Sequence, residues 1–266
     1  MEYSLRNTYI VYCNEGEFMA DIIYTYQNQV YMNITNKCDC SCQFCIRSHR
    51  DQVGEAENLW FKKDPTLEEI KAAIDAFDFS KYEEVVYCGY GEPTCALENL
   101  LASGAYIKQK YNIRIRLNTN GLANLYHKRN IISELAKVVD RVSISLNAPT
   151  AEKYQEVTRP QFENAFSAML EFAELAKENF SHTQLSIVDV LPPEEIDICQ
   201  KIADDRGIFL KIRKFVLIFL VKKGGIGPPF FNWKFLSNTK NTVDTVTPKR
   251  YYDYMVSLWS YIKEVR

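Results

Sequence analysis

Segments that favour β-strands alternate along this chain with segments of helical periodicity, and this alternation constrains the fold more than any other feature. Thr66 and Glu69 are spaced as a capping box before one helical stripe, and Pro193 and Gly207 bracket another. Strands and helices that alternate at this spacing predict a parallel sheet with helical crossovers. The strand-like runs lie at residues 30–34, 84–88, 113–118, 141–146, 184–190 and 208–213.

The sequences that follow the predicted strands favour a barrel over an open sheet. The alternation by itself fits an open doubly wound sheet, a barrel or a partial barrel. The unusual sequences, however, all lie just past the carboxyl end of a strand, where (β/α) barrels build their active sites. We therefore expect an α/β fold of the barrel type.

Composition excludes several classes of protein. The 266 residues are 47% hydrophobic and 25% charged, with a formal net charge of −2, so a basic nucleic-acid surface is not indicated. Eight cysteines are too dilute for a disulfide scaffold. The first residues lack the apolar stretch of a secretory signal, and the apolar run at residues 215–221 is far shorter than the roughly 20 residues of a membrane-spanning helix. We expect a cytoplasmic protein without membrane association.

Four cysteines lie close together after the first predicted strand: Cys38, Cys40, Cys42 and Cys45. Thiolates select soft metals, namely zinc, copper or iron–sulfur clusters. A structural zinc site normally takes its cysteines from two separated pairs, and four ligands this close would crowd one tetrahedral ion. Cys38, Cys42 and Cys45 alone form C-x3-C-x2-C, which can hold three irons of a four-iron cluster and leave the fourth open. Cys40 then lies outside this spacing and is not expected to bind iron.

The sequence C-D-C-S-C-Q-F-C, with Phe44 before the last cysteine, resembles the C-x3-C-x-Φ-C signature of radical S-adenosylmethionine (radical SAM) enzymes. The turn G-Y-G-E-P at residues 89–93 is similar to the Gly-Gly-Glu-Pro turn of that family, and T-N-G and S-L-N follow strands three and four as in many members. The resemblance covers residues 30–214 and implies a partial (β/α)6 TIM-type barrel with parallel strands. N-I-T-N-K-C, C-I-R and S-L-N-A-P resemble, more narrowly, the subfamily associated with TatD-type nucleases.

The resemblance implies a single 4Fe–4S cluster on Cys38, Cys42 and Cys45, whose open iron binds S-adenosylmethionine. Reductive cleavage of this cofactor would give methionine and a 5′-deoxyadenosyl radical, which abstracts hydrogen from an unidentified substrate. The protein would hold cofactor and substrate in line and exclude water. The implied partners are a reductant such as flavodoxin or ferredoxin and, functionally, a TatD-type nuclease.

The residues expected around S-adenosylmethionine follow the strands. Glycines 89 and 91 would let the backbone approach the cofactor closely, and Glu92 would accept a hydrogen bond from its ammonium group. Ser145 and Asn147 would occupy alternate positions of a strand and so face the same side, where they would bind the ribose hydroxyls or merely cap the strand. The full set of expected contacts is Phe44, Gly89, Gly91, Glu92, Pro93, Thr119, Asn120, Ser145, Asn147 and Asp189.

Several of these residues have a second interpretation. Phe44 either packs against the adenine or shields the cluster from water. Asp189 either faces the cofactor or substrate or is a structural carboxylate. T-N-G is also a good turn sequence by itself. Arg159 and Arg213 are further candidates for anion contacts.

Three parts are expected along the chain: an N-terminal extension of residues 1–19, the barrel domain of residues 20–215, and a C-terminal tail of residues 216–266 that ends in an amphipathic helix.

Two other functions compete with the radical SAM enzyme. One is a zinc-binding interaction module without catalysis, and the other is an activase that acts on a glycyl-radical enzyme.

Overall fold

The computed structural model describes residues 20–48 and 53–213. The expected N-terminal extension, the apolar run at residues 215–221 and the tail with its amphipathic helix lie outside the described residues. No helix within the described ranges is long and apolar enough to cross a membrane.

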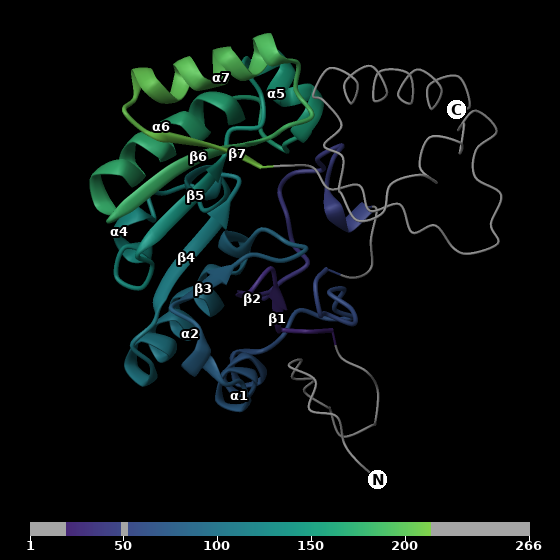
Figure 1. The fold of residues 1–266 in the computed structure, drawn as a ribbon, viewed down its shortest axis with the longest axis vertical. Helices are drawn as coiled ribbons and strands as arrows, with labels where there is room; N and C mark the ends of the chain where they lie inside the picture. The colour runs from purple at the N-terminus through teal and green to yellow at the C-terminus, as the bar shows by residue number, and fades with distance from the viewer. Residues whose placement is uncertain (1–19, 49–52, 214–266) are drawn as a thin grey trace, which may run out of the picture.

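Seven strands form one sheet, and each strand is hydrogen-bonded to the next along the chain (Figure 1). The six parallel strands coincide with the six predicted from the sequence, so the expected α/β fold is confirmed. The strands are β1 (Ile23–Tyr26), β2 (Gln29–Met32), β3 (Glu84–Tyr87), β4 (Arg114–Thr119), β5 (Arg141–Ser145), β6 (His182–Val188) and β7 (Phe209–Arg213).

The sequence did not predict strand β1, which pairs antiparallel with β2, so the sheet is mostly rather than wholly parallel. The two strands form a hairpin whose turn residues, Gln27 and Asn28, have φ angles of 49° and 60°. Such left-handed turns usually contain glycine, and this one does not. The hairpin therefore lacks its usual sequence signal.

The capping box predicted at the start of the first long helix is present. Thr66 Oγ1 accepts a hydrogen bond from Glu69 N at 3.2 Å, and Glu69 Oε2 accepts one from Thr66 N at 2.7 Å. The α-helices are α1 (Leu67–Ala76), α2 (Leu97–Lys110), α3 (Ala123–Tyr126), α4 (Ile132–Leu135), α5 (Ala151–Thr158), α6 (Ala165–Asn179) and α7 (Pro193–Asp205). Three 3-10 helices are also described: η1 (Ile46–Ser48), η2 (Phe79–Lys81) and η3 (Pro93–Ala96).

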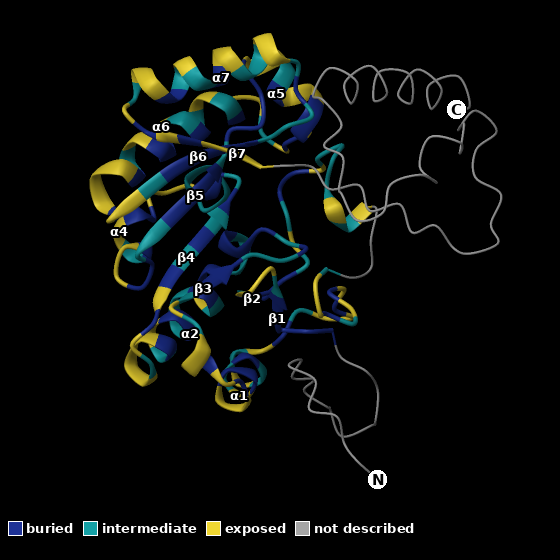
Figure 2. Ribbon diagram, in the orientation of Figure 1, coloured by how far each residue is buried: buried dark blue, intermediate teal, exposed yellow. Residues whose placement is uncertain are grey.

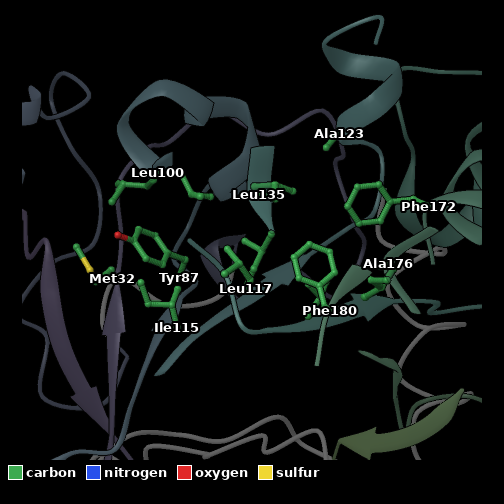
Figure 3. Close-up of a cluster of buried hydrophobic side chains, with 14 of the residues drawn as sticks. Met32, Tyr87, Leu100, Ile115, Leu117, Ala123, Leu135, Phe172, Ala176 and Phe180 are labelled. Carbon is green, nitrogen blue, oxygen red and sulfur yellow. The ribbon is translucent and has the colours of Figure 1, made fainter. Parts of the chain in front are cut away.

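The main core lies between the sheet and the helices, and alternate residues of strands β2 to β6 contribute to it (Figures 2 and 3). Leu117 of β4 and Phe172 of α6 are each fully buried there. We call this side of the sheet the outer face. Its strand residues include Met32, Val85, Tyr87, Ile115, Leu117, Val142, Ile144, Leu185, Ile187 and Leu210.

The opposite side, here called the inner face, is mostly polar. Side chains alternate along a strand, so the residues between the core positions point away from the helices. One inner-face hydrogen bond joins neighbouring strands, from Gln184 Nε2 to Ser143 Oγ at 3.0 Å. The inner face comprises Tyr31, Glu84, Val86, Arg116, Asn118, Arg141, Ser143, Ser145, Gln184, Ser186, Val188, Lys211 and Arg213.

Candidate active site

The cysteine loop follows β2 at the carboxyl end of the parallel strands, and it divides its four thiols into two groups. Cys38, Cys42 and Cys45 are partly exposed, whereas Cys40 is only 4% exposed and packs in the core. Asn120 Nδ2 lies 3.5 Å from the Cys40 sulfur. Cys40 thus differs in exposure from the three cysteines that the sequence pattern groups together, although its thiol contacts that of Cys42.

Backbone hydrogen bonds hold the cysteine loop against the last residues of α5. Ser41 N donates to Thr158 O at 3.0 Å, and Gln43 N donates to Val157 O at 2.9 Å. Arg159, a candidate for anion contacts, instead ends α5 in the left-handed conformation, with φ of 47° and an exposed side chain. Arg159 therefore has a structural position as the residue that ends α5.

Arg47 binds three carbonyl groups around the loop. Its Nη1 donates to Asn36 O at 3.5 Å and to Tyr90 O at 3.4 Å, and its Nη2 donates to Cys40 O at 3.3 Å. These carbonyls belong to the start of the loop, its middle and the turn after β3. One guanidinium group therefore fixes the loop to the neighbouring turn.

The thiols of the loop have perturbed acidities. Burial, reinforced by the charge of Glu92, raises the pKa of Cys38 to about 12. Burial also raises the pKa of Cys45, and hydrogen bonding and charge from Arg47 oppose that rise. The pKa of Cys42 is lowered, chiefly by a hydrogen bond with Cys40. A thiolate is the form that binds metal, so positive charge from Arg47 favours ligation.

Glu92 connects the turn after β3 to the turn after β4. It is only 5% exposed, and its Oε1 accepts hydrogen bonds from Thr94 Oγ1 and Thr119 Oγ1, both at 2.8 Å, and from Thr94 N at 3.2 Å. Its Oε2 accepts one from Asn120 N at 2.8 Å. Burial, together with the charge of Asp39, raises the pKa of Glu92 to about 7.

The two glycines of the turn are required by contacts within the chain. A Cβ atom on Gly91 would lie 2.3 Å from Thr35 O and 2.6 Å from Lys37 O, and one on Gly89 would lie 2.1 Å from Asn33 Oδ1. Their close approach is thus to the end of β2 and the start of the cysteine loop. The sequence predicted close approach to the cofactor, so the structure gives these glycines a different reason.

Asn120 joins the turn after β4 to the cysteine loop. Its side chain donates a short hydrogen bond to Asp39 Oδ1, and its Oδ1 accepts one from Leu122 N at 2.9 Å. Together with Glu92 and Thr119, it makes one connected network of the three loops. The T-N-G sequence therefore forms a turn and also links the cysteine loop to the turn after β3.

Phe44 and Pro93 are explained by packing. Phe44 is half-buried and packs against the main core, and Pro93 is buried as the first residue of η3. Proline suits this first helical position because the missing N–H has no helical partner.

The expected placement of Ser145 and Asn147 on one strand is wrong. Strand β5 ends at Ser145, and Asn147 lies beyond it in the left-handed conformation with φ of 57°. The strand cannot continue through such a residue, so the two side chains do not share a strand face. Asn147 is 7% exposed, and its Oδ1 has no hydrogen-bond partner within residues 20–48 and 53–213. A buried acceptor of this kind is available to a water molecule or a ligand.

Asp189, which the sequence placed within a strand at residues 184–190, lies just beyond the end of that strand in the structure. Strand β6 ends at Val188, and Asp189 N donates to Arg213 O at 3.0 Å on the neighbouring strand. The side chain is half-exposed beside the end of β7.

Sequence reasoning missed three residues that organise the site: Asp39, Arg47 and Asp64. Asp64 accepts hydrogen bonds from Thr35 Oγ1 at 2.8 Å and from Asn36 N at 2.9 Å, and so holds the start of the cysteine loop. Arg47 lies in the C-I-R sequence, which carried the subfamily resemblance without a role for the arginine. Asp64 lies far from the motif in sequence, so only the fold reveals it.

The residues fit an iron–sulfur cluster with S-adenosylmethionine. Three partly exposed thiols come from one loop, and Asn147 offers a buried acceptor nearby in the same group of strand-end loops. No three His, Cys, Asp or Glu side chains of the described residues converge on a single ion position. Cysteines that ligate a cluster bind separate irons, so they need no common point.

Comparison with known proteins identifies the family. A model of the radical SAM superfamily matches residues 32–205, which is more than half of the chain. No curated protein sequence matches the chain.

Solved structures share the fold at low sequence identity. Native anSMEcpe with bound AdoMet is 18% identical, with a TM-score of 0.51 over 70% of this chain and 50% of that protein. Methylornithine synthase (PylB) is 13% identical, with a TM-score of 0.52 over 70% of this chain and 52% of that protein. HydG, a maturase of the [FeFe]-hydrogenase, is 14% identical, with a TM-score of 0.52 over 74% of this chain and 46% of that protein. The chain thus spans about half the length of these solved proteins. By its family match and its partial barrel, the chain belongs to the radical SAM superfamily.

Proposed function

We propose that this chain is a radical SAM enzyme with one 4Fe–4S cluster on Cys38, Cys42 and Cys45. When bound, the reduced cluster supplies the electron that cleaves S-adenosylmethionine to methionine and a 5′-deoxyadenosyl radical, which takes a hydrogen atom from the substrate. The observation that carries this proposal is the division of the loop into three partly exposed thiols and one buried thiol. Family membership supports it independently.

The chain's own residues hold the cofactor in this proposal. Asn147 Oδ1 accepts a hydrogen bond from a ribose hydroxyl, which would give this buried atom a partner. Glu92 Oε2 accepts one hydrogen bond within the chain and has capacity for a second, from the cofactor's ammonium group. The remaining proposed contacts are Phe44, Gly89, Gly91, Pro93, Thr119, Asn120, Ser145 and Asp189.

The narrower assignments also belong to this proposal. Their support is the sequence resemblance to the subfamily associated with TatD-type nucleases. The enzyme would receive electrons from a donor such as flavodoxin or ferredoxin, in a reducing compartment such as the cytoplasm. Residues 20–215 would form the catalytic domain, flanked by an extension at residues 1–19 and a tail at residues 216–266.

Anaerobic reconstitution tests the proposal directly. The full chain is loaded with iron and sulfide, and its metal content and absorption spectrum are measured. It is then reduced with dithionite in the presence of S-adenosylmethionine, and the products are analysed. We expect a brown protein with about four irons per chain that forms 5′-deoxyadenosine.

Matched cysteine variants complete the experiment. Cys42→Ala is expected to form no 5′-deoxyadenosine, whereas Cys40→Ala is expected to form it. A colourless wild-type protein that holds zinc and forms no 5′-deoxyadenosine would instead identify a zinc-binding module.

A further inference from the structure

The inner face of the sheet carries more cations than its own carboxylate can neutralise. Glu84 is the one acidic residue among the inner-face residues defined above, and it is already shared by two arginines. Its Oε1 lies 2.8 Å from Arg116 Nε, and its Oε2 lies 3.5 Å from Arg141 Nη1. Within the described residues, Glu84 forms no ion pair with the cations of β7, although its charge reaches Lys211.

Lys211 and Arg213 are those cations. They lie two residues apart on β7, so both side chains point to the inner face, opposite Ser186 and Val188 of β6. Both residues are exposed. Within residues 20–48 and 53–213, neither side chain is hydrogen-bonded or ion-paired to another residue.

The carboxyl end of β7 lies at the same edge of the parallel strands as the end of β2, from which the cysteine loop follows. Desolvation lowers the pKa of Arg213, and negative charge on Cys88, Cys42 and Tyr31 opposes this effect. Those three groups come from the turn after β3, the cysteine loop and β2. Arg213 therefore lies within electrostatic range of the opposite side of the partial barrel.

The two cations also repel each other and a third one. Desolvation lowers the pKa of Lys211, the charges of Arg116 and Arg213 lower it further, and the charge of Glu84 opposes them. Like charges held together on a concave surface are unfavourable until an anion joins them. Binding of an anionic group between Lys211 and Arg213 would therefore relieve this repulsion and be favourable.

Neutral hydrogen-bonding groups and aromatic rings line the rest of this region. Gln184 and Ser143 are buried on the inner face, and Asn118 Oδ1 has no hydrogen-bond partner in the described part of the chain. At the other edge, the rings of Tyr24 and Tyr31 stack with centroids 5.3 Å apart. The region is thus polar on one side and aromatic on the other, as in many small-molecule sites.

We propose that Lys211 and Arg213 bind an anionic oxygen group of the substrate, a carboxylate or a phosphate, on the inner face of the sheet. This inference rests on the proposed function, which places S-adenosylmethionine on the adjacent loops. The anionic group would bind the end of β7, and the rest of the substrate would extend toward the cysteine loop.

Binding of simple anions tests this inference on the reconstituted full chain. Inorganic phosphate and succinate are titrated separately by calorimetry, anaerobically and with S-adenosylmethionine present. The test variant is Lys211→Gln/Arg213→Gln. The matched control is Lys137→Gln/Lys201→Gln, which removes the same charge from two exposed residues outside the inner face.

We expect at least one of the two anions to bind the wild-type protein, and the anion that binds identifies phosphate or carboxylate as the group recognised. The test variant should weaken that binding about tenfold or more, as loss of charge-assisted hydrogen bonds requires. The control variant should bind within about twofold of wild type. The affinity for S-adenosylmethionine should be nearly equal in all three proteins.

Three results would overturn the inference. Neither anion binds the wild-type protein, or the test variant binds as well as wild type. Alternatively, the anion and S-adenosylmethionine compete, and the test variant loses affinity for S-adenosylmethionine, so that the two cations hold the cofactor's own carboxylate. The cluster content and 5′-deoxyadenosine yield of the wild-type sample are measured first, so failure of the proposed function is seen separately.

Discussion

The two faces of the sheet are built from the same strands but differ in the kind of side chain that they present. On the outer face, Leu117 and Ile144 are fully buried against helices. On the inner face and just beyond it, Asn118 and Asn147 each have a buried oxygen without a partner in the described part of the chain. Burial of apolar side chains stabilises the fold, whereas unsatisfied polar groups reduce stability unless a ligand pairs with them. Because side chains alternate along each strand, one sheet presents an apolar face that stabilises the fold and a polar face that we propose binds ligands.

The largest expected effect is the loss of iron when one of the three proposed cysteine ligands is replaced. Replacing Cys38, Cys42 or Cys45 by Ala should abolish cluster loading, because each of the three irons depends on one thiolate. Iron and sulfide analysis after anaerobic reconstitution measures this. Cys40→Ala is the matched control and should retain most of the iron, since its thiol is buried in the core. Loss of iron in Cys40→Ala but not in Cys42→Ala would reverse the ligand assignment.

A substitution on the outer face should act on folding instead. Leu117→Ala leaves a cavity among buried side chains and should lower the free energy of unfolding by about 2–5 kcal/mol. Denaturant titration of the cluster-free chain measures this. Ser145→Ala, at the end of the next strand, should change the same quantity by less than about 0.5 kcal/mol. Equal losses in both variants would show that the two faces are not separated.

The pH dependence of stability should reveal the buried carboxyl that connects the loops. Glu92 has a pKa of about 7 in the fold, above the ordinary 4.5, so its protonated form is favoured by folding. Its stabilising contribution is complete below about 4.5 and is lost as the pH rises through about 7. Unfolding of the cluster-free chain should therefore need less denaturant at pH 8 than at pH 5. The difference is on the order of 3 kcal/mol.

Glu92→Gln isolates this titration. The amide does not ionise, so the variant should lose less stability than wild type between pH 5 and pH 8, whatever its absolute stability. Parallel curves for the two proteins would mean that other groups, such as Asp39, account for the pH dependence.

The smallest expected effect belongs to Asn147. Asn147→Gly removes the unpaired amide and keeps a residue that tolerates the left-handed backbone. Loss of one hydrogen bond should weaken S-adenosylmethionine binding by about 3–10-fold and leave the iron content unchanged. Equilibrium binding to the reconstituted protein measures this. Unchanged affinity would remove Asn147 from the cofactor site.

The fold was largely predictable from the sequence because its signals are local. Apolar periodicity and the Thr66–Glu69 capping box located strands and helices within a few residues. Strand β1 was missed because its hairpin turn uses Gln27 and Asn28 in a conformation that usually takes glycine.

The site was predictable only in part, because its organisation depends on contacts between distant segments. The three cysteines that the spacing grouped, Cys38, Cys42 and Cys45, are partly exposed in the structure, and their role as ligands stays a prediction. The end of β5 was misjudged, since the left-handed backbone of Asn147 is not visible in an apolar pattern. Arg47 and Asp64 act through backbone groups of other loops, and sequence spacing does not reveal such contacts.

Arg47 has a consequence for how the metal centre is acquired. The guanidinium group holds the carbonyls of Asn36, Cys40 and Tyr90 through hydrogen bonds between protein atoms. Preorganisation lowers the entropy lost on binding, so more of the thiolate–iron affinity is retained. In the proposed enzyme, iron and sulfide would therefore meet a loop that contacts within the chain have already shaped.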